Sequence, residues 1–236
     1  MIASIHRTSL NAVERIIVYN LGLRWWEKYS LNLLHRVTVI DYPPIAYRFF
    51  DGYLDPRGFA YKCFALWDAG KYGEYIFWLD AGAMALKDIK SIYDIIKKED
   101  IFLVEDRGWR NFQWTTPQCL DIIKATEKEK NDFHLSAGIL GYKVNGKYQK
   151  LVNEAFNYSK IKECIHGPRK IKDPYMPFLR GHRHDQSIYS ILASRYGCPR
   201  QDIGIYGEWR KDALNDKTVI YVHRRTYYDI TGLLKK

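Results

Sequence analysis

An apolar run that ends in a carboxylate is the feature that most constrains the fold of this chain. Residues 75–86 read YIFWLDAGAMAL, so five apolar residues are followed by Asp80, Ala81 and Gly82. A continuous apolar run of this kind is typical of a strand that is buried on both faces in a parallel sheet. In open α/β sheets, ligands bind beyond the carboxyl ends of such strands. We therefore expect Asp80 at a ligand site, and the competing interpretation is a cap for the next helix.

Segments typical of strands and helices alternate along the chain. Strands are expected over residues 15–22, 36–41, 75–86, 101–105, 133–142 and 218–223, and helices over 60–69, 89–98, 118–126, 148–158 and 186–196. This alternation favours an α/β fold with a mostly parallel mixed sheet flanked by helices, as in Rossmann-like domains. A length of 236 residues fits one domain over residues 1–236.

The composition indicates a folded, basic protein. Hydrophobic residues make up 47% of the chain and aromatic residues 15%, which excludes a disordered chain. The formal charge of +10 favours anionic partners without choosing among phosphates, acidic glycans, nucleic acid or a membrane surface. Basic residues are densest over 160–172, 180–184 and 223–225, and a solvated face explains the first of these groups.

Cysteine spacing and the N-terminal residues bear on the compartment. Cys63, Cys119, Cys164 and Cys198 lie far apart without C-x-x-C pairing, so we expect reduced thiols and no zinc site. The first residues lack the basic start and apolar core of a signal peptide. No run approaches the ~20 apolar residues that a membrane helix needs. The sequence as given therefore predicts a cytoplasmic protein without a transmembrane segment.

Common nucleotide-binding and hydrolase motifs are missing from the sequence. It contains no G-x-G-x-x-G, P-loop, G-x-S-x-G or H-E-x-x-H pattern, so dehydrogenases, P-loop NTPases, α/β-hydrolases and zincins are not favoured. Polar residues near the ends of the expected elements remain as candidates: Lys62, Asp80, Ser136, Arg183, His184, Asp185, Gln186 and His223.

Four segments, taken in order, resemble a known family. They are residues 18–23 (VYNLGL), 61–62 (YK), 78–81 (WLDA) and 182–187 (HRHDQS), with Ile191 and Leu192 following. Together they resemble the uncharacterised DUF1647 family, whose broader relatives are GT-A nucleotide-sugar glycosyltransferases. The similarity covers roughly residues 10–200, and the Asp-Gln-Ser block is its most specific part. The resemblance implies a single GT-A-like domain that uses a nucleotide-sugar donor and a glycan or another hydroxyl-bearing acceptor.

The resemblance implies a donor and metal site around Asp80. Asp80, Ala81 and Gly82 occupy the place of the Asp-x-Asp motif, whose carboxylates hold Mn²⁺ or Mg²⁺ against the donor diphosphate. Gly82 removes one expected carboxylate, which puts metal dependence in question. Asp80 and His223 are the candidate ligands, although a lone histidine at a strand end is more often structural. The alternative source of positive charge, without a metal, is a set of basic residues: Lys62, Arg183, Arg224 and Arg225.

Further donor-binding residues follow from the same resemblance. Lys62 begins a helix in a place where similar enzymes bring a basic residue to the donor, and the competing interpretation is a surface lysine. The turn expected at Ser136, Ala137 and Gly138 resembles the small-residue turn beside the donor sugar. A turn that needs small residues only for packing would look the same.

Asp185 is the preferred catalytic residue. It precedes an apolar-periodic helix, so its structural interpretation is an N-cap or a residue next to the cap. The functional interpretation is a general base on an acceptor hydroxyl in an inverting transfer, or a ligand of sugar hydroxyls in a retaining one. His184 is the alternative base, since its ordinary pKa of ~6.5 suits proton transfer near neutrality. Aromatic residues at 109, 112 and 114 provide either an acceptor platform or ordinary packing.

The start of the chain departs from the family pattern. GT-A enzymes have a nucleotide-contacting strand before the first helix, whereas this sequence opens in that helix, so the first strand is expected to be missing. A truncated gene product, a domain completed by another segment, and a divergent form that binds the base differently all explain this.

The sequence therefore predicts a glycosyltransferase that transfers a sugar from a nucleotide-diphosphate donor to a hydroxyl, with metal assistance. One alternative is a catalytically inactive GT-A-like domain that binds sugar nucleotides or glycans, which Gly82 and the short N-terminus favour. A second alternative is a basic nucleic-acid-binding module. It ranks last, and no nucleic-acid partner is expected, because the chain has no recognisable nucleic-acid motif.

Overall fold

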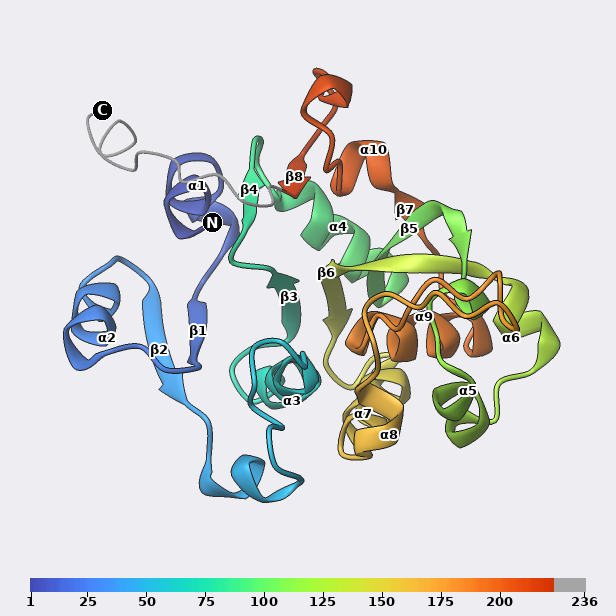
Figure 1. Cartoon of the computed structure of the whole chain (residues 1–236). Helices are drawn as coiled ribbons and strands as arrows, with labels where there is room; N and C mark the ends of the chain where they lie inside the picture. The colour runs from blue at the N-terminus through green and yellow to red at the C-terminus, as the bar shows by residue number, and fades with distance from the viewer. Residues whose placement is uncertain (223–236) are drawn as a thin grey trace.

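The computed structural model describes residues 1–222, and a four-stranded sheet lies at its centre (Figure 1). The strand order is β3 (Tyr75–Leu79), β6 (Phe133–Lys143), β5 (Ile101–Arg110) and β7 (Gln201–Asp202). β6 runs antiparallel to both β3 and β5, and β7 is parallel to β5. β6 therefore lies between β3 and β5, although it follows both of them in the sequence.

Two further strand pairs lie outside this sheet. β1 (Ile16–Asn20) pairs in parallel with β2 (Val37–Asp41), and β4 (Ala83–Ala85) pairs antiparallel with β8 (Ile220–Val222). The expectation of mostly parallel pairing is wrong, because three of the five strand pairs in residues 1–222 are antiparallel. The physical reason is that helices and turns between β5 and β6 bring the chain back along the strand it has just left.

Helices flank the strands, which confirms the mixed α/β class and the central sheet. They are α1 (Ile2–Thr8), α2 (Trp25–Asn32), α3 (Ala60–Ala69), α4 (Lys90–Glu99), α5 (Pro117–Ile123), α6 (Glu127–Asn131), α7 (Gln149–Ser159), α8 (Lys162–Ile165), α9 (Asp185–Arg195) and α10 (Ile203–Tyr206). Short 3₁₀ turns form η1 (Leu10–Ala12), η2 (Pro44–Arg48), η3 (Asn111–Gln113) and η4 (Lys211–Ala213).

The central sheet is buried on both faces. Along β5, Ile101 and Leu103 join an apolar cluster with residues of α3, α7 and α9, whereas Phe102 and Val104 join a second cluster with residues of α4. Successive side chains of a strand point to opposite faces, so a continuous apolar run is what two covered faces require.

β3 is the terminal strand of the central sheet rather than a strand in its middle. The apolar run 75–86 is split into two strands, because the chain turns after Leu79 and the Ala83 amide donates a 2.8 Å hydrogen bond to the Asp80 carbonyl. The second strand of the run, β4, leaves the central sheet to pair with β8. The turn places Asp80 at the end of β3, as the sequence predicts.

The β1–β2 pair and α2 lie beside β3 on the left of Figure 1. Within residues 1–222, β1 is hydrogen-bonded to β2 and not to β3. A cavity of about 750 Å³ lies between β1 and β3, and residues of these two strands and of α3 and α4 line it. The chain enters α1 at Ile2 and reaches its first strand only at Ile16, in agreement with the expectation that it opens in a helix.

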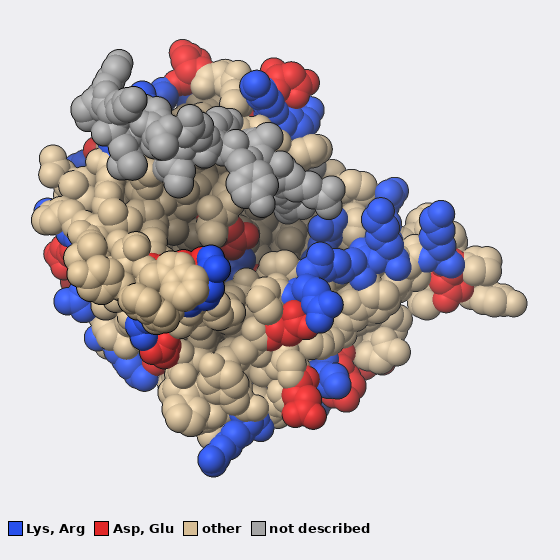
Figure 2. Space-filling view, turned by 60° about the vertical axis from the view of Figure 1, so that its left-hand side comes forward, with Lys and Arg blue, Asp and Glu red and all other residues tan. Residues whose placement is uncertain are grey.

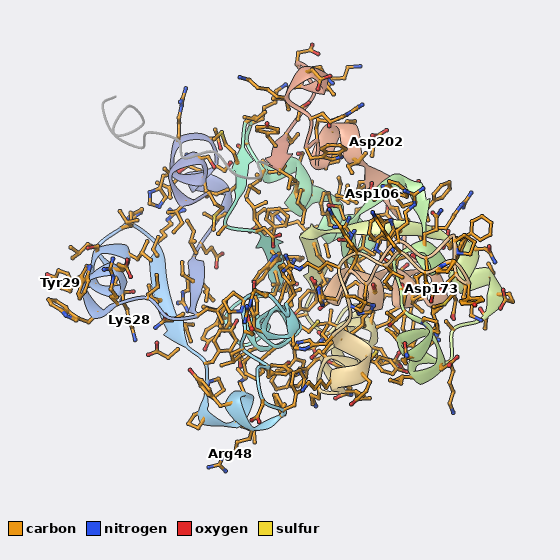
Figure 3. The ribbon with its side chains drawn as sticks, viewed as in Figure 1. Lys28, Tyr29, Arg48, Asp106, Asp173 and Asp202 are labelled. Carbon is orange, nitrogen blue, oxygen red and sulfur yellow. The ribbon has the colours of Figure 1, made fainter. Side chains whose placement is uncertain are left out.

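Exposed aromatic and basic side chains are distributed over the surface. Trp25 is 76% exposed and Tyr29 is 61% exposed on α2, and Lys28 and Tyr29 lie at the outer end of the β1–β2 unit in Figure 3. Basic side chains on the face shown in Figure 2 are interspersed with acidic ones.

In residues 1–222, none of the helices combines the length and the apolar character that crossing a membrane requires.

Candidate functional site

Lys62 joins the two carboxylates that the sequence singles out. It lies in the first turn of α3, and its Nζ is 3.0 Å from Asp80 Oδ1 and 3.2 Å from Asp185 Oδ2. The Lys62 side chain is only 3% exposed, and its ammonium also lies 5.3 Å from the centre of the Trp78 ring. The surface-lysine interpretation of Lys62 is therefore wrong, because a buried ammonium needs the paired carboxylates that surround it.

Asp80 is fixed at the end of β3 by backbone and side-chain contacts. Its amide donates a 2.9 Å hydrogen bond to the Gly138 carbonyl, and Trp78 Nε1 donates a 2.7 Å hydrogen bond to Asp80 Oδ1. The carboxylate is still 40% exposed. Asp80 therefore has one oxygen held toward the protein interior and remains open to a ligand.

The small residues predicted as a turn lie inside strand β6. Leu103 pairs with Leu140 and the next residue, Val104, pairs with Ser136, so β6 bulges in between. A Cβ at Gly138 would be 3.1 Å from Asp80 Oδ2, which is tighter than ordinary van der Waals contact. The expected turn is thus a bulge, and glycine is needed there because the Asp80 carboxylate packs on its backbone.

Asp185 is the first residue of α9 and is buried, with 4% of its surface exposed. Gln186 Nε2 donates to the Leu135 carbonyl and Ser187 Oγ donates to the Trp114 carbonyl at 2.6 Å, so the start of α9 is attached to β6 and to the segment after η3. Burial raises the pKa of Asp185 to about 6, with the Lys62 ammonium opposing this shift and the Asp80 carboxylate adding to it. A carboxyl with such a pKa can exchange a proton near neutral pH.

Lys62 stays charged in this environment. Burial alone would lower its pKa, but the carboxylates of Asp185 and Asp80 outweigh burial and raise the pKa above its ordinary value. The ammonium is therefore a permanent positive charge between two acids, and Lys62 is not a proton donor at neutral pH.

The imidazole ring of His184 is fixed in one orientation. Its ring is buried, Nδ1 is 3.0 Å from the Ile165 carbonyl oxygen as a donor, and the ring lies 5.5 Å from the Phe59 ring. Burial lowers its pKa to about 4, so the ring is neutral at pH 7. The backbone of His184 has φ 54°, a strained value for a residue with a side chain, at the position directly before α9.

Arg183 and the aromatic residues form a separate group. The Arg183 guanidinium lies 4.0 Å from the centre of the Trp114 ring, and the rings of Trp109 and Trp114 meet edge to face at 5.5 Å. Arg180 lies 4.5 Å above Trp109. Phe112 lines a groove with residues of the 175–179 segment.

A cavity of about 430 Å³ opens beside Asp80. Asp80, Ala81 and Gly82 line one side of it, and Tyr42, Phe59 and Tyr61 are among the aromatic residues that line the rest. Ala81 and Gly82 are exposed in the turn between β3 and β4. The volume falls in the range of ordinary ligand sites, and the aromatic walls can stack against a planar ring.

The part of the chain that the structure describes supplies few metal ligands. Residues 1–222 contain no cluster of three or more His, Cys, Asp or Glu side chains placed to hold an ion. Asp80 Oδ2 lies close to Gly138, whereas Oδ1 already contacts Lys62 and Trp78. The other predicted ligand, His223, lies outside the described residues, as do Arg224 and Arg225.

Trp78 is a site residue whose role the sequence analysis does not identify. It contacts both Asp80 and Lys62 from the strand that delivers Asp80. Residues two apart on a strand lie on the same face, so the spacing of Trp78 and Asp80 is a signal that could have revealed the contact.

Comparison with known proteins identifies the fold. No family model and no curated sequence matches the chain. Among solved structures, the WbbM bifunctional glycosyltransferase superposes with a TM-score of 0.54 at 13% identity, covering 87% of this chain and 36% of that chain. The galactosyltransferase LgtC in complex with donor and acceptor sugar analogues has a TM-score of 0.48, with 15% identity over 86% of this chain and 71% of that one. Mouse xyloside xylosyltransferase 1 has a TM-score of 0.48, with 12% identity over 94% and 91%.

The likeness to WbbM shows that the fold is GT-A-like, and the chain spans about a third of the length of that protein. The resemblance to the DUF1647 family stays a prediction, because no family model matches.

Proposed function

We propose that this protein transfers a sugar from a nucleotide-diphosphate donor to a hydroxyl group of an acceptor. The observation that carries the proposal is the Asp80–Lys62–Asp185 arrangement. The buried Lys62 ammonium lies between the partly exposed Asp80 carboxylate at the end of β3 and the buried Asp185 carboxyl at the start of α9, whose pKa is raised. Two carboxylates in different environments suit two different roles in one reaction, here donor binding by Asp80 and proton transfer by Asp185.

The cavity beside Asp80 is the proposed donor site. Its aromatic walls at Tyr42, Phe59 and Tyr61 would stack against the nucleobase, while Asp80 at the rim would face the diphosphate side. Of the other predicted donor residues, Gly138 contacts Asp80 and supports its position, whereas Arg183 packs over the Trp114 ring. We therefore place Asp80, Ala81 and Gly82 against the donor.

In this proposal, Asp80 is the one protein ligand that the described residues would offer to a divalent cation. Asp80 Oδ2 would hold Mn²⁺ or Mg²⁺ that is otherwise bound by donor phosphates and water, as Mg²⁺ commonly is. When bound, the cation would offset the negative charge of the leaving diphosphate. Lys62 stabilises the charge of Asp80 itself, so it supports the site whether or not a cation is present.

Asp185 is the proposed general base. Its pKa of about 6 leaves it ionised at pH 7, and it can then accept the proton of an acceptor hydroxyl as the hydroxyl attacks the sugar. His184 is less suited to this role, because its Nδ1 proton is donated to the Ile165 carbonyl and its ring is buried beside Phe59. In the proposed reaction His184 instead positions the residue that follows it.

A donor screen tests the proposal. The thermal unfolding temperature is measured with UDP, GDP, CMP, dTDP and their sugars, each with and without Mn²⁺, because a ligand that binds only the folded state raises it. We expect one nucleotide series to stabilise the protein, and Asp80→Ala to remove the effect. Asp121→Ala, a change at an exposed acid on α5, is the matched control and should retain it.

Turnover separates an enzyme from an inactive binding domain. Release of the nucleoside diphosphate from the stabilising donor sugar is followed for the native protein and for Asp185→Asn. We expect release by the native protein and a loss of at least ~100-fold in the variant, as for removal of a general base. Binding without any release would contradict the proposal and favour the inactive domain.

A further inference from the structure

Two buried cysteine thiols meet between α5 and α8. Cys119 Sγ and Cys164 Sγ are 3.2 Å apart, and neither residue has any exposed surface. The bond in a disulfide is about 2.05 Å long, so the two sulfur atoms need to approach by only about 1 Å to be joined. The contact belongs to neither the carboxylate site nor the cavity beside it.

We propose that Cys119 and Cys164 form a disulfide when the chain folds in the presence of a small-molecule disulfide such as oxidised glutathione. One sulfur–sulfur bond forms, the two thiols lose two protons and two electrons, and the glutathione disulfide is reduced to two thiols. All four cysteines are free thiols in the structure, as the sequence predicts, and the proposed bond is an oxidised form of one pair of them. Disulfides of this kind persist in oxidising compartments and are rare in the cytosol.

The other two cysteines are expected to remain thiols. Cys63 lies on α3 and Cys198 follows α9. The sulfur–sulfur contact at 3.2 Å is between Cys119 and Cys164, and it is this pair that we expect to be joined. Burial raises the pKa of the Cys119 thiol, which makes it a poor nucleophile once the protein is folded. The bond should therefore form during folding, while the thiols are still accessible.

The bond would brace the segment that leads to Asp185. Thr116, at the start of α5, donates its amide proton to His182 Nδ1 at 3.3 Å. At the end of α8, the Ile165 carbonyl accepts from His184 Nδ1 at 3.0 Å. Because Cys119 and Cys164 lie in these same two helices, a disulfide would fix the distance between the partners of both histidines. This consequence for the site rests on the proposed function, whereas the bond itself does not.

Counting thiols tests the bond directly. The protein is refolded with a mixture of reduced and oxidised glutathione, denatured without reductant and titrated with a thiol reagent. We expect two free thiols, rising to four after reduction, and a cross-linked peptide pair containing Cys119 and Cys164 in a digest made without reductant. Four free thiols after oxidative refolding, or a linked pair containing Cys63 or Cys198, would overturn the assignment.

Melting temperatures give a second readout that needs no donor. Reductant should lower the unfolding temperature of the native protein by about 5–10 °C, since the bond closes a loop of about 45 residues. Cys198→Ser is the matched control and should show the same drop, whereas C119S/C164S should not respond to reductant. Equal unfolding temperatures of the oxidised and reduced native protein would contradict a bracing bond. Each of these results is independent of whether the protein transfers a sugar.

Discussion

The Nζ atom of Lys62 lies 3.2 Å from Asp185 Oδ2, and both side chains are almost completely buried. An ion pair in this setting owes its stability to the match between the two charges, because neither is hydrated. Asp80 adds a second, more exposed carboxylate to the same ammonium. The geometry of the proposed site therefore depends on a single lysine.

Replacing this lysine should destabilise the protein. Lys62→Met would leave the Asp80 and Asp185 carboxylates without the cation between them, and we expect a loss of about 3–5 kcal/mol in the free energy of unfolding. Urea denaturation measures it. The matched control is Lys90→Met, which breaks an exposed ion pair with Asp94 and should cost at most about 1 kcal/mol.

A second substitution distinguishes lost charge balance from lost packing. In the K62M/D185N double variant one uncompensated carboxylate is removed, so the protein should regain part of the stability lost in Lys62→Met. A double variant that is less stable than Lys62→Met would show that the ion pair is not the reason for the effect.

Removing the hydrogen bond to Asp80 should lower turnover while keeping the fold. Trp78→Phe deletes the Nε1 donor that contacts Asp80 Oδ1 at 2.7 Å but preserves most of the ring. A hydrogen bond to a charged group contributes about 1.5 kcal/mol or more, which corresponds to a loss of roughly 10-fold in kcat/KM. Trp209→Phe, at a tryptophan that is 59% exposed, should leave kcat/KM unchanged. An equal loss in both variants would argue against a role for the Trp78 contact.

Adding one methyl group at Gly138 should disturb Asp80. Gly138→Ala would place a Cβ 3.1 Å from Asp80 Oδ2, so the carboxylate has to move. Because small displacements of a reacting group are costly, we expect kcat/KM to fall by roughly 10- to 100-fold. Gly73→Ala, where the nearest atom is 3.9 Å away, is the control. Unchanged kinetics in Gly138→Ala would place Asp80 outside the reaction centre.

The pH dependence of activity should report the titration of Asp185. A general base must be ionised, and the raised pKa of Asp185 lies near 6, so kcat/KM should fall as the pH is lowered through this value. An acidic limb near pH 4, as for an ordinary aspartate, would contradict this assignment.

The titration of Asp185 should also affect stability. Raising the pH should increase kcat/KM but decrease the contribution of Asp185 to the free energy of unfolding. The folded state binds the Asp185 proton more tightly than the unfolded state, whose aspartate titrates near 3.8, so the contribution of this group to stability decreases as the pH rises from about 4 to 6. In Asp185→Asn that decrease should be absent when unfolding free energies are compared across this range. The comparison also separates an effect on activity from acid unfolding.

Several features of the protein could be predicted from local sequence. The run ending at Asp80 does form a strand followed by a turn, and Asp185 does begin a helix. Strand and helix periodicity acts over a few neighbouring residues, so it survives in the folded chain. The mixed α/β class and the order of most elements follow from it.

Other features depend on which elements pack together. The antiparallel insertion of β6 between β3 and β5, the bulge at Gly138 and the contact of Trp78 with Asp80 all arise from pairing between segments that are distant in sequence. Lys62, Asp80 and Asp185 are ordinary residues when viewed singly. Tertiary structure alone buries Lys62 between the other two and raises the pKa of Asp185, because desolvation and charge pairing are set by neighbours in space.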